Sequence, residues 1–341
     1  MNEPQYDPAN VYLITGAAGF IGCHMAKRLL DAGARVIGLD NMNSYYELKL
    51  KEERLAQLKG YESFHFIKGD ISDKSLIRTS FATHRPNVVI HLAAQAGVLH
   101  SIDQPDVYMS SNVLGFYNVL EACRQYPVEH LIYASSSSVY GANKKVPFEE
   151  TDMTDTPISL YASTKKSNEL MAYTYSHLFR IPATGLRFFT VYGPMGRPDM
   201  SYYKFANMHF AGKSIPIYNN GDLEHDLYRD FTYIDDIVAG LERLLGHAPT
   251  GEVPHQLFNI GNNRPEKLMV FIETLERCLS RAAGRTIVFD KRFEPIKAGD
   301  VPATYASTER LQQAVGFKPE TPIEVGLQQF ADWYVSYHGI S

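Results

Sequence analysis

A tyrosine and a lysine four positions apart, Tyr161 and Lys165, are the residues of this sequence best suited to move a proton. On a helix this spacing places both side chains on one face. A free tyrosine has a pKa of about 10, too high for a base at neutral pH, and a nearby cation lowers it by favouring the phenolate. A serine run at residues 135–138 precedes the pair, and Ser136 or Ser138 can hydrogen-bond the same hydroxyl. Because the spacing is common by chance, an exposed helical pair without chemistry is the alternative.

Near the start of the chain, the apolar stretch 11–15 runs into a segment that contains Gly16, Gly19 and Gly22. This pattern is typical of a strand that turns tightly into a helix whose N-terminus binds a dinucleotide pyrophosphate. Gly16 permits the turn, Gly19 lets the backbone approach the phosphates, and Gly22 lets helix and strand pack closely. The spacing GxxGxxG departs from the commoner GxGxxG, so a glycine-rich turn without a ligand is the alternative.

Asp40 ends the next apolar stretch, residues 35–39, where a carboxylate can accept hydrogen bonds from the adenosine ribose. The residue after it is Asn41, so no arginine stands there to neutralise a 2′-phosphate. We therefore expect NAD as the cofactor and not NADP. The positive nicotinamide ring and Lys165 would together lower the pKa of Tyr161, and loss of the substrate proton would let a carbinol carbon pass hydride to the ring.

The elements that must position these residues alternate along the chain. Apolar stretches at 11–15, 35–39, 64–68, 88–92, 131–134 and 183–187 predict strands, and residues 112–124 and 161–179 have helical patterns. This alternation predicts an α/β fold with a Rossmann-type doubly wound parallel sheet. Past Arg187 the pattern breaks into loops. We expect an NAD-binding domain at 1–188, with a return of the chain at about 229–260, and a smaller C-terminal α/β substrate lobe at 189–341 over the carboxyl ends of the strands.

Composition narrows the class of protein. Basic and acidic residues number 33 and 38 in 341 residues, so we expect neither nucleic acid nor a membrane surface as a partner. No apolar stretch is long enough to span a bilayer, and the first residues do not begin a signal peptide. Cys23, Cys123 and Cys278 lack metal-like spacing, so we expect free thiols in a reducing cytoplasm and no metal site.

Further motifs extend these two signals over nearly the whole chain. They are Gly69-Asp70-Ile71, residues 92–97 (Leu-Ala-Ala-Gln-Ala-Gly), residues 135–141, Val191-Tyr192-Gly193-Pro194 and Arg229-Asp230-Phe231-Thr232. With them the sequence resembles an extended short-chain dehydrogenase/reductase of the nucleotide-sugar epimerase type. The resemblance implies an isomerase with NAD bound by Gly16, Gly19, Phe20, Ile21, Gly22, Asp40, Asn41, Asp70, Ile71, Leu92, Ala93, Ala94, Gln95, Asn112, Tyr161, Lys165 and Phe189.

Two segments are similar to the UDP-glucuronate 4-epimerase pattern: residues 192–200, which include Arg197, and residues 43–51. The resemblance implies substrate contacts from Ser136, Ser137, Ser138, Thr190, Arg197, Met200, Pro216, Ile217, Tyr218, Arg229 and Asp300. Arg229 is expected to bind the diphosphate, and a surface ion pair with Asp226 or Asp230 is its alternative. Arg197 is expected to pair with the sugar carboxylate, and an Arg197–Asp199 pair that only stabilises a turn is its alternative.

The expected reaction is reversible 4-epimerisation of a UDP-sugar, UDP-glucuronate to UDP-galacturonate, through a transient 4-keto intermediate, which implies a place in polysaccharide biosynthesis. A UDP-glucose or UDP-N-acetylglucosamine 4-epimerase is the first alternative. A UDP-glucuronate decarboxylase or 4,6-dehydratase follows, although those enzymes carry acidic residues where Ser137 and Ser138 stand. A non-catalytic NAD-binding regulator is the alternative of a different class.

The sequence departs from the uronate epimerase pattern at three positions. Leu99 and His100 stand where an arginine and a tyrosine are usual, and Lys297 replaces a glutamine. The helical stretches 112–124 and 161–179 are apolar on more than one face, for example at Leu114 and Leu170, beyond what packing on a sheet requires. Family members commonly pair these helices, so we expect a homodimer.

Overall fold

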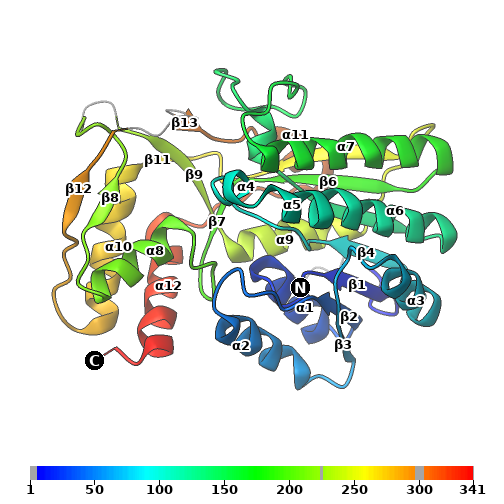
Figure 1. Ribbon diagram of the computed structural model, residues 1–341, viewed down its shortest axis with the longest axis horizontal. Coiled ribbons are helices and arrows are strands. Elements are labelled where there is room, and N and C mark those ends of the chain that lie inside the picture. The colour runs from blue at the N-terminus through cyan, green and yellow to red at the C-terminus, as the bar shows by residue number, and fades with distance from the viewer. Residues whose placement is uncertain (1–5, 223–225, 296–302, 341) are drawn as a thin grey trace.

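The computed structural model describes residues 6–222, 226–295 and 303–340. Within them, seven strands form a parallel sheet in the order β10-β6-β5-β4-β1-β2-β3 (Figure 1). Their bounds are β1 Val11–Thr15, β2 Arg35–Asp40, β3 Phe64–Lys68, β4 Val88–His91, β5 His130–Ser136, β6 Ala183–Phe188 and β10 His255–Ile260. The strands predicted from the apolar stretches are β1 to β6. The expected doubly wound α/β fold is therefore confirmed.

Helices cover both faces of this sheet (Figure 1). Neighbours along β1 point to opposite sides, so Leu13 belongs to the apolar cluster on one face of the sheet and Ile14 to the cluster on the other. Burial on both faces explains why the strands read as continuous apolar runs and not as alternating ones. The helices with their connections are α1 Phe20–Asp31, α2 Leu48–Lys59, α3 Lys74–His84, α4 His100–Asp103, α5 Pro105–Tyr108, η1 Met109–Gly115, α6 Phe116–Gln125, η2 Ser137–Tyr140, α7 Leu160–Phe179 and α9 Ile234–Leu245.

The two predicted helices are both present, and one differs in form. The stretch 161–179 is α7, an α-helix throughout. The stretch 112–124 begins inside η1, a π-helical segment, and continues as α6. A π-helical turn is rare and is often found at functional sites. Asn112 lies on this segment and is buried.

Of the remaining elements, α11 packs against β10 of the main sheet, and the others form a smaller part beside the carboxyl ends of the main strands (Figure 1). In it β9 pairs with β7, β11 and β13, and β8 pairs with β12. Their bounds are β7 Thr190–Tyr192, α8 Ser201–Phe210, β8 Ile215–Ile217, β9 Tyr228–Tyr233, β11 Pro265–Lys267, α10 Leu268–Ala283, β12 Lys291–Phe293, β13 Ala303–Thr304, α11 Glu309–Val315 and α12 Ile323–His338. The chain returns to the main sheet through α9 and β10, and one apolar core joins both parts, from Ile14 to Phe330. The division at residue 188 remains a proposal.

An aromatic cluster holds α8 against α12 in the smaller part. Tyr203 of α8 packs against Phe330, Trp333 and Tyr334 of α12, with ring centroids 5.8, 5.7 and 5.4 Å away. Tyr337, one turn further on, stacks on Trp333 at 5.0 Å. Aromatic rings of this size bury large apolar areas, so the cluster fixes the position of α8, which follows the loop of Arg197.

Among the helices of the described ranges, none combines the length and the apolar composition that crossing a lipid bilayer requires. Cys23, Cys123 and Cys278 are all buried and free, as the sequence predicts.

Candidate active site

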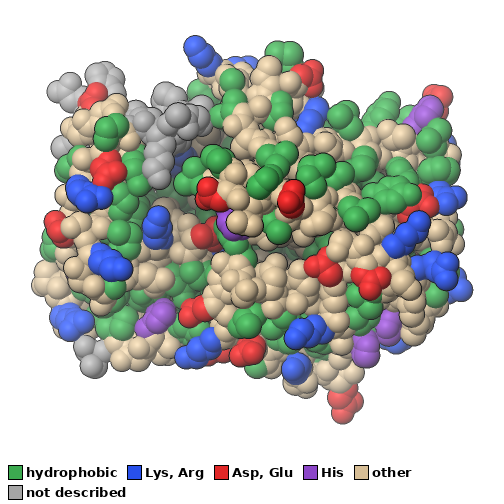
Figure 2. All heavy atoms as spheres, viewed as in Figure 1, with side chains coloured by type: hydrophobic (Ala, Val, Ile, Leu, Met, Phe, Trp, Pro, Cys, Tyr) green, Lys and Arg blue, Asp and Glu red, His purple; other side chains and the backbone are tan. Residues whose placement is uncertain are grey.

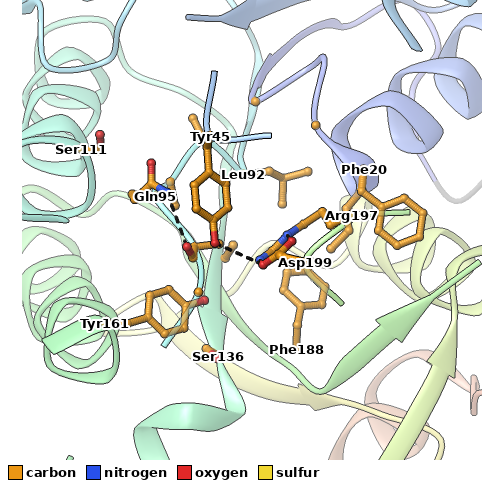
Figure 3. A pocket seen from close by; sticks show the side chains of 18 of the residues that line it. Phe20, Tyr45, Leu92, Gln95, Ser111, Ser136, Tyr161, Phe188, Arg197 and Asp199 are labelled. Atoms are coloured by element: carbon orange, nitrogen blue, oxygen red, sulfur yellow. Dashed lines mark hydrogen bonds and ion pairs between the residues drawn. The ribbon is translucent and has the colours of Figure 1, made fainter. Parts of the chain in front are cut away.

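A cavity of about 990 Å³ opens at the carboxyl ends of the central strands, between the main sheet and the smaller part (Figure 3). This is where open α/β sheets bind ligands. Most of the predicted site residues line it: Gly16, Gly19, Phe20, Ile21, Gly22, Asp40, Asn41, Ile71, Leu92, Ala93, Ala94, Gln95, Ser136, Ser137, Ser138, Tyr161, Lys165, Phe189, Thr190, Arg197 and Met200.

The glycine turn leaves room for a ligand and has no room for side chains. Gly16 has a φ of +77°, and its N–H donates to the carbonyl of Leu39 at 2.7 Å. A Cβ on Gly22 would lie 2.1 Å from the Gly16 carbonyl oxygen, and one on Gly19 would lie 2.9 Å from it. Gly19 caps α1 without a side-chain hydrogen bond, so the first N–H groups of the helix face the cavity uncapped. Such an end suits a phosphate, and the turn fits the pyrophosphate of a dinucleotide.

Asp40 is held by the backbone around it. Its carboxylate accepts hydrogen bonds from the N–H groups of Ala18 at 3.1 Å and Met42 at 2.8 Å. A carboxylate has about four acceptor positions, so two contacts leave capacity for ribose hydroxyls. Lys51, which belongs to the segment 43–51 noted in the sequence but was not expected at the cofactor, lies 3.8 Å from Asp40 and donates to Asn43 at 2.9 Å. Burial lowers the pKa of Lys51, and the negative charge of the nearby Asp40 carboxylate partly opposes this shift.

Two of the predicted cofactor residues do not line the cavity but hold residues that do. Asp70 accepts a hydrogen bond from the Asn41 side chain at 2.7 Å. Asn112 lies behind the turn of residues 92–95, where its side chain accepts from the N–H of Gln95 at 2.8 Å and donates to the Gln95 carbonyl at 3.0 Å. It also donates to Thr164 of α7 at 3.1 Å. The structure thus gives Asn112 a supporting position between the turn and the helix of Tyr161.

Tyr161 and Lys165 lie one turn apart at the start of α7, and both face the cavity. Ser159 caps this helix by accepting from the N–H of Ala162 at 3.1 Å. The Ser136 hydroxyl lies within hydrogen-bond reach of Tyr161 and 3.1 Å from the Ser138 hydroxyl. The predicted proton-transfer group is therefore assembled at the end of β5 (Figure 3).

The pKa values of this pair differ from the expectation. Burial raises the pKa of Tyr161, and the Ser136 hydrogen bond and the charge of Arg197 only partly oppose it. Burial also lowers the pKa of Lys165 to about 8, while its ammonium donates to the Ala134 carbonyl at 2.7 Å. Lys165 therefore does not by itself lower the pKa of Tyr161. The remaining contribution has to come from the positive charge of the bound nicotinamide.

A buried ion pair lies directly beneath the serine run. Arg187 of β6 donates to Glu169 of α7 through Nε at 2.8 Å and Nη2 at 2.9 Å. Ser135 donates to the same carboxylate at 2.6 Å, and Tyr140 accepts from Arg187 at 3.0 Å. These contacts join β5, β6, α7 and η2, so they fix the strand end that carries Ser136. No local sequence pattern predicts these hydrogen bonds.

Within the cavity lining, Arg197 forms a bidentate pair with Asp199. Nε and Nη2 donate to the two carboxylate oxygens at 3.0 and 2.5 Å (Figure 3). The Tyr45 hydroxyl donates to Asp199 at 3.2 Å from the opposite wall. Burial opposes the charge of Asp199, but Arg197 outweighs it and holds the pKa of that carboxyl below its usual value. The ion pair considered as the alternative role of Arg197 is thus present, and it faces the cavity.

The other predicted substrate residues are not among those that line the described cavity. Pro216 and Ile217 belong to β8, which pairs with β12, and Ile217 is fully buried in the apolar core. Tyr218 follows them and does not line the cavity either. Arg229 lies on β9, where it donates to the Tyr228 carbonyl at 2.8 Å. Asp300 and Lys297 lie outside the described residues.

The alternative pairing of Arg229 with Asp230 is not formed. Asp230 is fully buried and accepts hydrogen bonds from the N–H groups of Asn262 at 2.6 Å, Asn263 at 3.1 Å and Ala306 at 3.0 Å. Burial raises the pKa of Asp230 against these contacts. This aspartate ties β9 to the segments beside it.

Several cavity residues had not been predicted. Tyr45, Asp199, Lys204, Ser111 and Phe188 all line it, together with the atypical Leu99 and His100. The His100 ring packs on Tyr45 with centroids 4.8 Å apart. The segment around Tyr45 belongs to a motif noted in the sequence, but only the fold shows that it crosses the cavity to Asp199.

Comparison with known proteins identifies the family of this chain. A family model described as the NAD dependent epimerase/dehydratase family matches residues 12–261. A probable UDP-glucuronate 4-epimerase of Rhizobium meliloti is 43% identical over 339 residues, which cover 95% of this chain and 96% of that one. The structure of a Bacillus cereus UDP-glucuronic acid 4-epimerase with UDP-glucuronic acid and NAD has a TM-score of 0.85 at 29% identity, covering 96% and 99% of the two chains. A Thermotoga maritima UDP-glucose 4-epimerase with UDP-glucose has a TM-score of 0.81 at 28% identity, covering 96% and 99%.

Proposed function

Because the chain belongs to the NAD-dependent epimerase/dehydratase family, we propose that it catalyses reversible 4-epimerisation of UDP-glucuronate to UDP-galacturonate. The observation that carries the proposal is the meeting of two groups in one cavity. Tyr161, Ser136 and Lys165 form a proton-transfer set at the strand ends, and Arg197 lies at the sugar end. NAD, when bound, supplies a reversible hydride acceptor beside them.

The residues of this chain handle the proton of the sugar hydroxyl. Tyr161 accepts the proton from oxygen 4 as carbon 4 becomes a ketone, and it returns the proton when carbon 4 is reduced from the other face. Ser136 orients the same oxygen by hydrogen bonding. Lys165 is 3% exposed, so its charge lies in a poorly solvated site, and only together with the positive charge of the bound nicotinamide would it favour the phenolate.

The composition of the serine run favours epimerisation over elimination or decarboxylation. Among residues 135–138 there is no carboxylate to move a proton at carbon 5 or 6. The keto intermediate of a uronate is a β-keto acid, which is prone to lose carbon dioxide. The hydroxyls of Ser138 and Thr190 line the cavity and could hold the carboxylate away from the geometry that favours this loss. A complete proton-transfer set also argues against a non-catalytic regulator.

One observation favours a second candidate, a 4-epimerase of a neutral UDP-hexose. The charge of Arg197 is already matched by Asp199. A uronate would have to displace Asp199 or share the arginine with it, whereas UDP-glucose would not. Leu99 and His100, which replace the usual arginine and tyrosine, point the same way because they remove a further cation.

Separate incubations decide between these candidates. NAD-loaded enzyme is given UDP-glucuronate, UDP-glucose or UDP-N-acetylglucosamine, and the products are identified by NMR. The proposal expects UDP-galacturonate from UDP-glucuronate, with slower turnover of the other two sugars. Faster conversion of UDP-glucose would transfer the assignment to the neutral hexose. A UDP-pentose product would indicate a decarboxylase. No turnover of any of the three sugars would favour the non-catalytic NAD-binding regulator.

We also propose a homodimer formed by η1, α6 and α7. Of the apolar residues on these helices, Phe116 and Leu120 are buried against the sheet, but Leu114, Leu170 and Tyr173 are exposed. Hydrophobic side chains gather over α6 and α7 (Figure 2). A second copy would cover this face by two-fold pairing of the helices. Light scattering at micromolar concentration tests it, and a monomeric mass would contradict it.

A cytoplasmic location is part of the proposal. Three buried cysteines remain free thiols, which suits a reducing compartment. The product, a UDP-activated uronic acid, suits consumption by the sugar-transfer reactions of polysaccharide biosynthesis.

A further inference from the structure

Arg54, on α2, is fully buried although it carries a charge. Buried arginines normally pair with a carboxylate, because an uncompensated charge in the interior is costly. Arg54 instead satisfies its guanidinium with neutral oxygens. It lies outside the residues that line the cavity, and none of the sequence motifs includes it.

The five hydrogen bonds of this guanidinium reach three separate segments. Nη1 donates to the Ala18 carbonyl at 3.1 Å and to the Tyr46 hydroxyl at 2.6 Å. Nε and Nη2 both donate to the Met195 carbonyl, at 3.0 and 2.7 Å. Nη2 also donates to the Gly196 carbonyl at 3.0 Å. A guanidinium has five N–H donors in a fixed plane, so all of them are used and their directions are set.

Each of these segments belongs to the site. Ala18 lies inside the glycine turn, and its N–H donates to Asp40. Tyr46 lines the cavity beside Tyr45. Met195 and Gly196 immediately precede Arg197. Arg54 therefore connects the turn that suits the dinucleotide with the loop that carries the arginine at the sugar end.

The loop of residues 193–199 has local features that require such support. Met195 has a φ of +56°, a left-handed conformation that is uncommon for a residue with a side chain. The side-chain amide of Gln57, one turn after Arg54 on α2, also donates to the sulfur of Met195 at 3.0 Å. Two residues of α2 therefore contact the loop. The charged residue, Arg54, binds the loop backbone.

We infer that Arg54 is a positioning residue that fixes the 193–199 loop against the glycine turn and thereby sets Arg197 for a sugar carboxylate. The inference rests on the proposed function for the identity of the sugar. Because Arg54 acts through Arg197, its loss should change discrimination between charged and neutral sugars and should leave the proton-transfer set in place.

The test compares Arg54→Met, Arg54→Lys and the control Lys59→Met, which removes an exposed cation from the same helix. Hydrogen exchange of residues 193–200 is measured on NAD-loaded protein without substrate. We expect exchange there to rise about tenfold or more in Arg54→Met, as loss of charged hydrogen bonds to the loop implies, to rise less in Arg54→Lys, and to be unchanged in Lys59→Met. Wild-type exchange in both Arg54 variants would overturn the inference.

Kinetics then separate positioning from general damage. The ratio of kcat/KM for UDP-glucuronate to that for UDP-glucose should fall in Arg54→Met, mainly through the KM of UDP-glucuronate. Combined with Arg197→Ala, the Arg54 change should lower this ratio no further. An equal loss on both sugars, or independent effects in the double variant, would overturn the inference. If Arg54→Met does not fold, Arg54→Lys decides by the same two measurements.

The outcomes also separate the two proposals. If the wild type epimerises no UDP-glucuronate, the proposed function fails, while exchange of residues 193–200 still decides whether Arg54 holds the loop. If the wild type is active and the exchange and the sugar ratio do not respond to Arg54, the inference fails alone.

Discussion

Removing one member of the buried pair of Glu169 and Arg187 should be one of the most destabilising single changes near the active site. Their side chains are 4% and 2% exposed, and two fork hydrogen bonds join them. Burial opposes the charge of Arg187, but Glu169 outweighs it and raises the pKa of that guanidinium. Glu169→Gln keeps the shape of the side chain and leaves the guanidinium buried with no opposite charge.

The cost follows from that geometry. Removing one member of a buried pair destabilises by about 3–5 kcal/mol. With an unfolding entropy of about 2.1 cal/mol/K per residue, a chain of 341 residues loses about 1.4 °C per kcal/mol, so the Tm should fall by about 4–7 °C. Replacing both members, as in Glu169→Leu with Arg187→Leu, removes the uncompensated charge. The double variant should therefore lose less than the sum of the single variants.

Urea unfolding at matched NAD concentration measures these losses, since bound NAD itself stabilises the folded state. Glu149→Gln is the control, because it breaks an exposed pair with Lys145 and should cost less than about 1 kcal/mol. A loss in Glu169→Gln as small as in the control would refute the reasoning. Additive losses in the double variant would refute it as well, since they would mean that the two charges do not depend on each other.

Four other perturbations test the site. Protein stripped of its cofactor should be reactivated by NAD and not by NADP, because Asp40 repels a 2′-phosphate; equal reactivation by both would contradict this role. Tyr161→Phe should abolish turnover and retain NAD, which is measured by the absorbance of the nucleotide released when the protein is denatured. Near-wild-type activity would place the base elsewhere. Arg197→Ala should reduce turnover of UDP-glucuronate far more than that of UDP-glucose, or release carbon dioxide and a UDP-pentose, whereas a small, equal loss would make the arginine structural. The pKa of Lys165 is about 8 in the folded protein and 10.5 is its ordinary value, so the unfolded state binds more protons between these pH values. The free energy of unfolding should rise across this window by at most about 3 kcal/mol in cofactor-free wild type relative to Lys165→Met, and parallel pH curves for the two would exclude the shift.

Local patterns predicted those parts of the molecule that local physics determines. The central strands β1, β4, β5 and β6 are largely buried on both faces, so their sequences contain continuous apolar runs. The spacing of Tyr161 and Lys165 is enough to place both on one side of a helix. The glycine turn was predictable because a tight turn and a close helix leave no space for a Cβ.

The rest depends on contacts between residues far apart in the chain. Arg54 reaches Met195, and Tyr45 reaches Asp199, only because the fold brings α2 and its preceding loop to the opposite side of the cavity. Pro216 to Tyr218 are expected at the sugar, but the sequence of so short a strand does not reveal its pairing partner, and only the fold shows that β8 pairs with β12. The pKa of Tyr161 could not be predicted either, since it depends on how completely α7 is buried.

The aromatic cluster between α8 and α12 also gives this protein an internal optical reporter. Trp333 is the single tryptophan of the chain, and it packs against Tyr203 and Tyr337 in the smaller part. Emission excited selectively from tryptophan therefore originates at one place, far along the chain from the glycine turn. Separation of α8 from α12 would change the polarity around this one indole, so a fluorescence trace reports on the smaller part while circular dichroism follows the whole fold. A difference between the two traces would measure how far the substrate-side elements can loosen before the main sheet does.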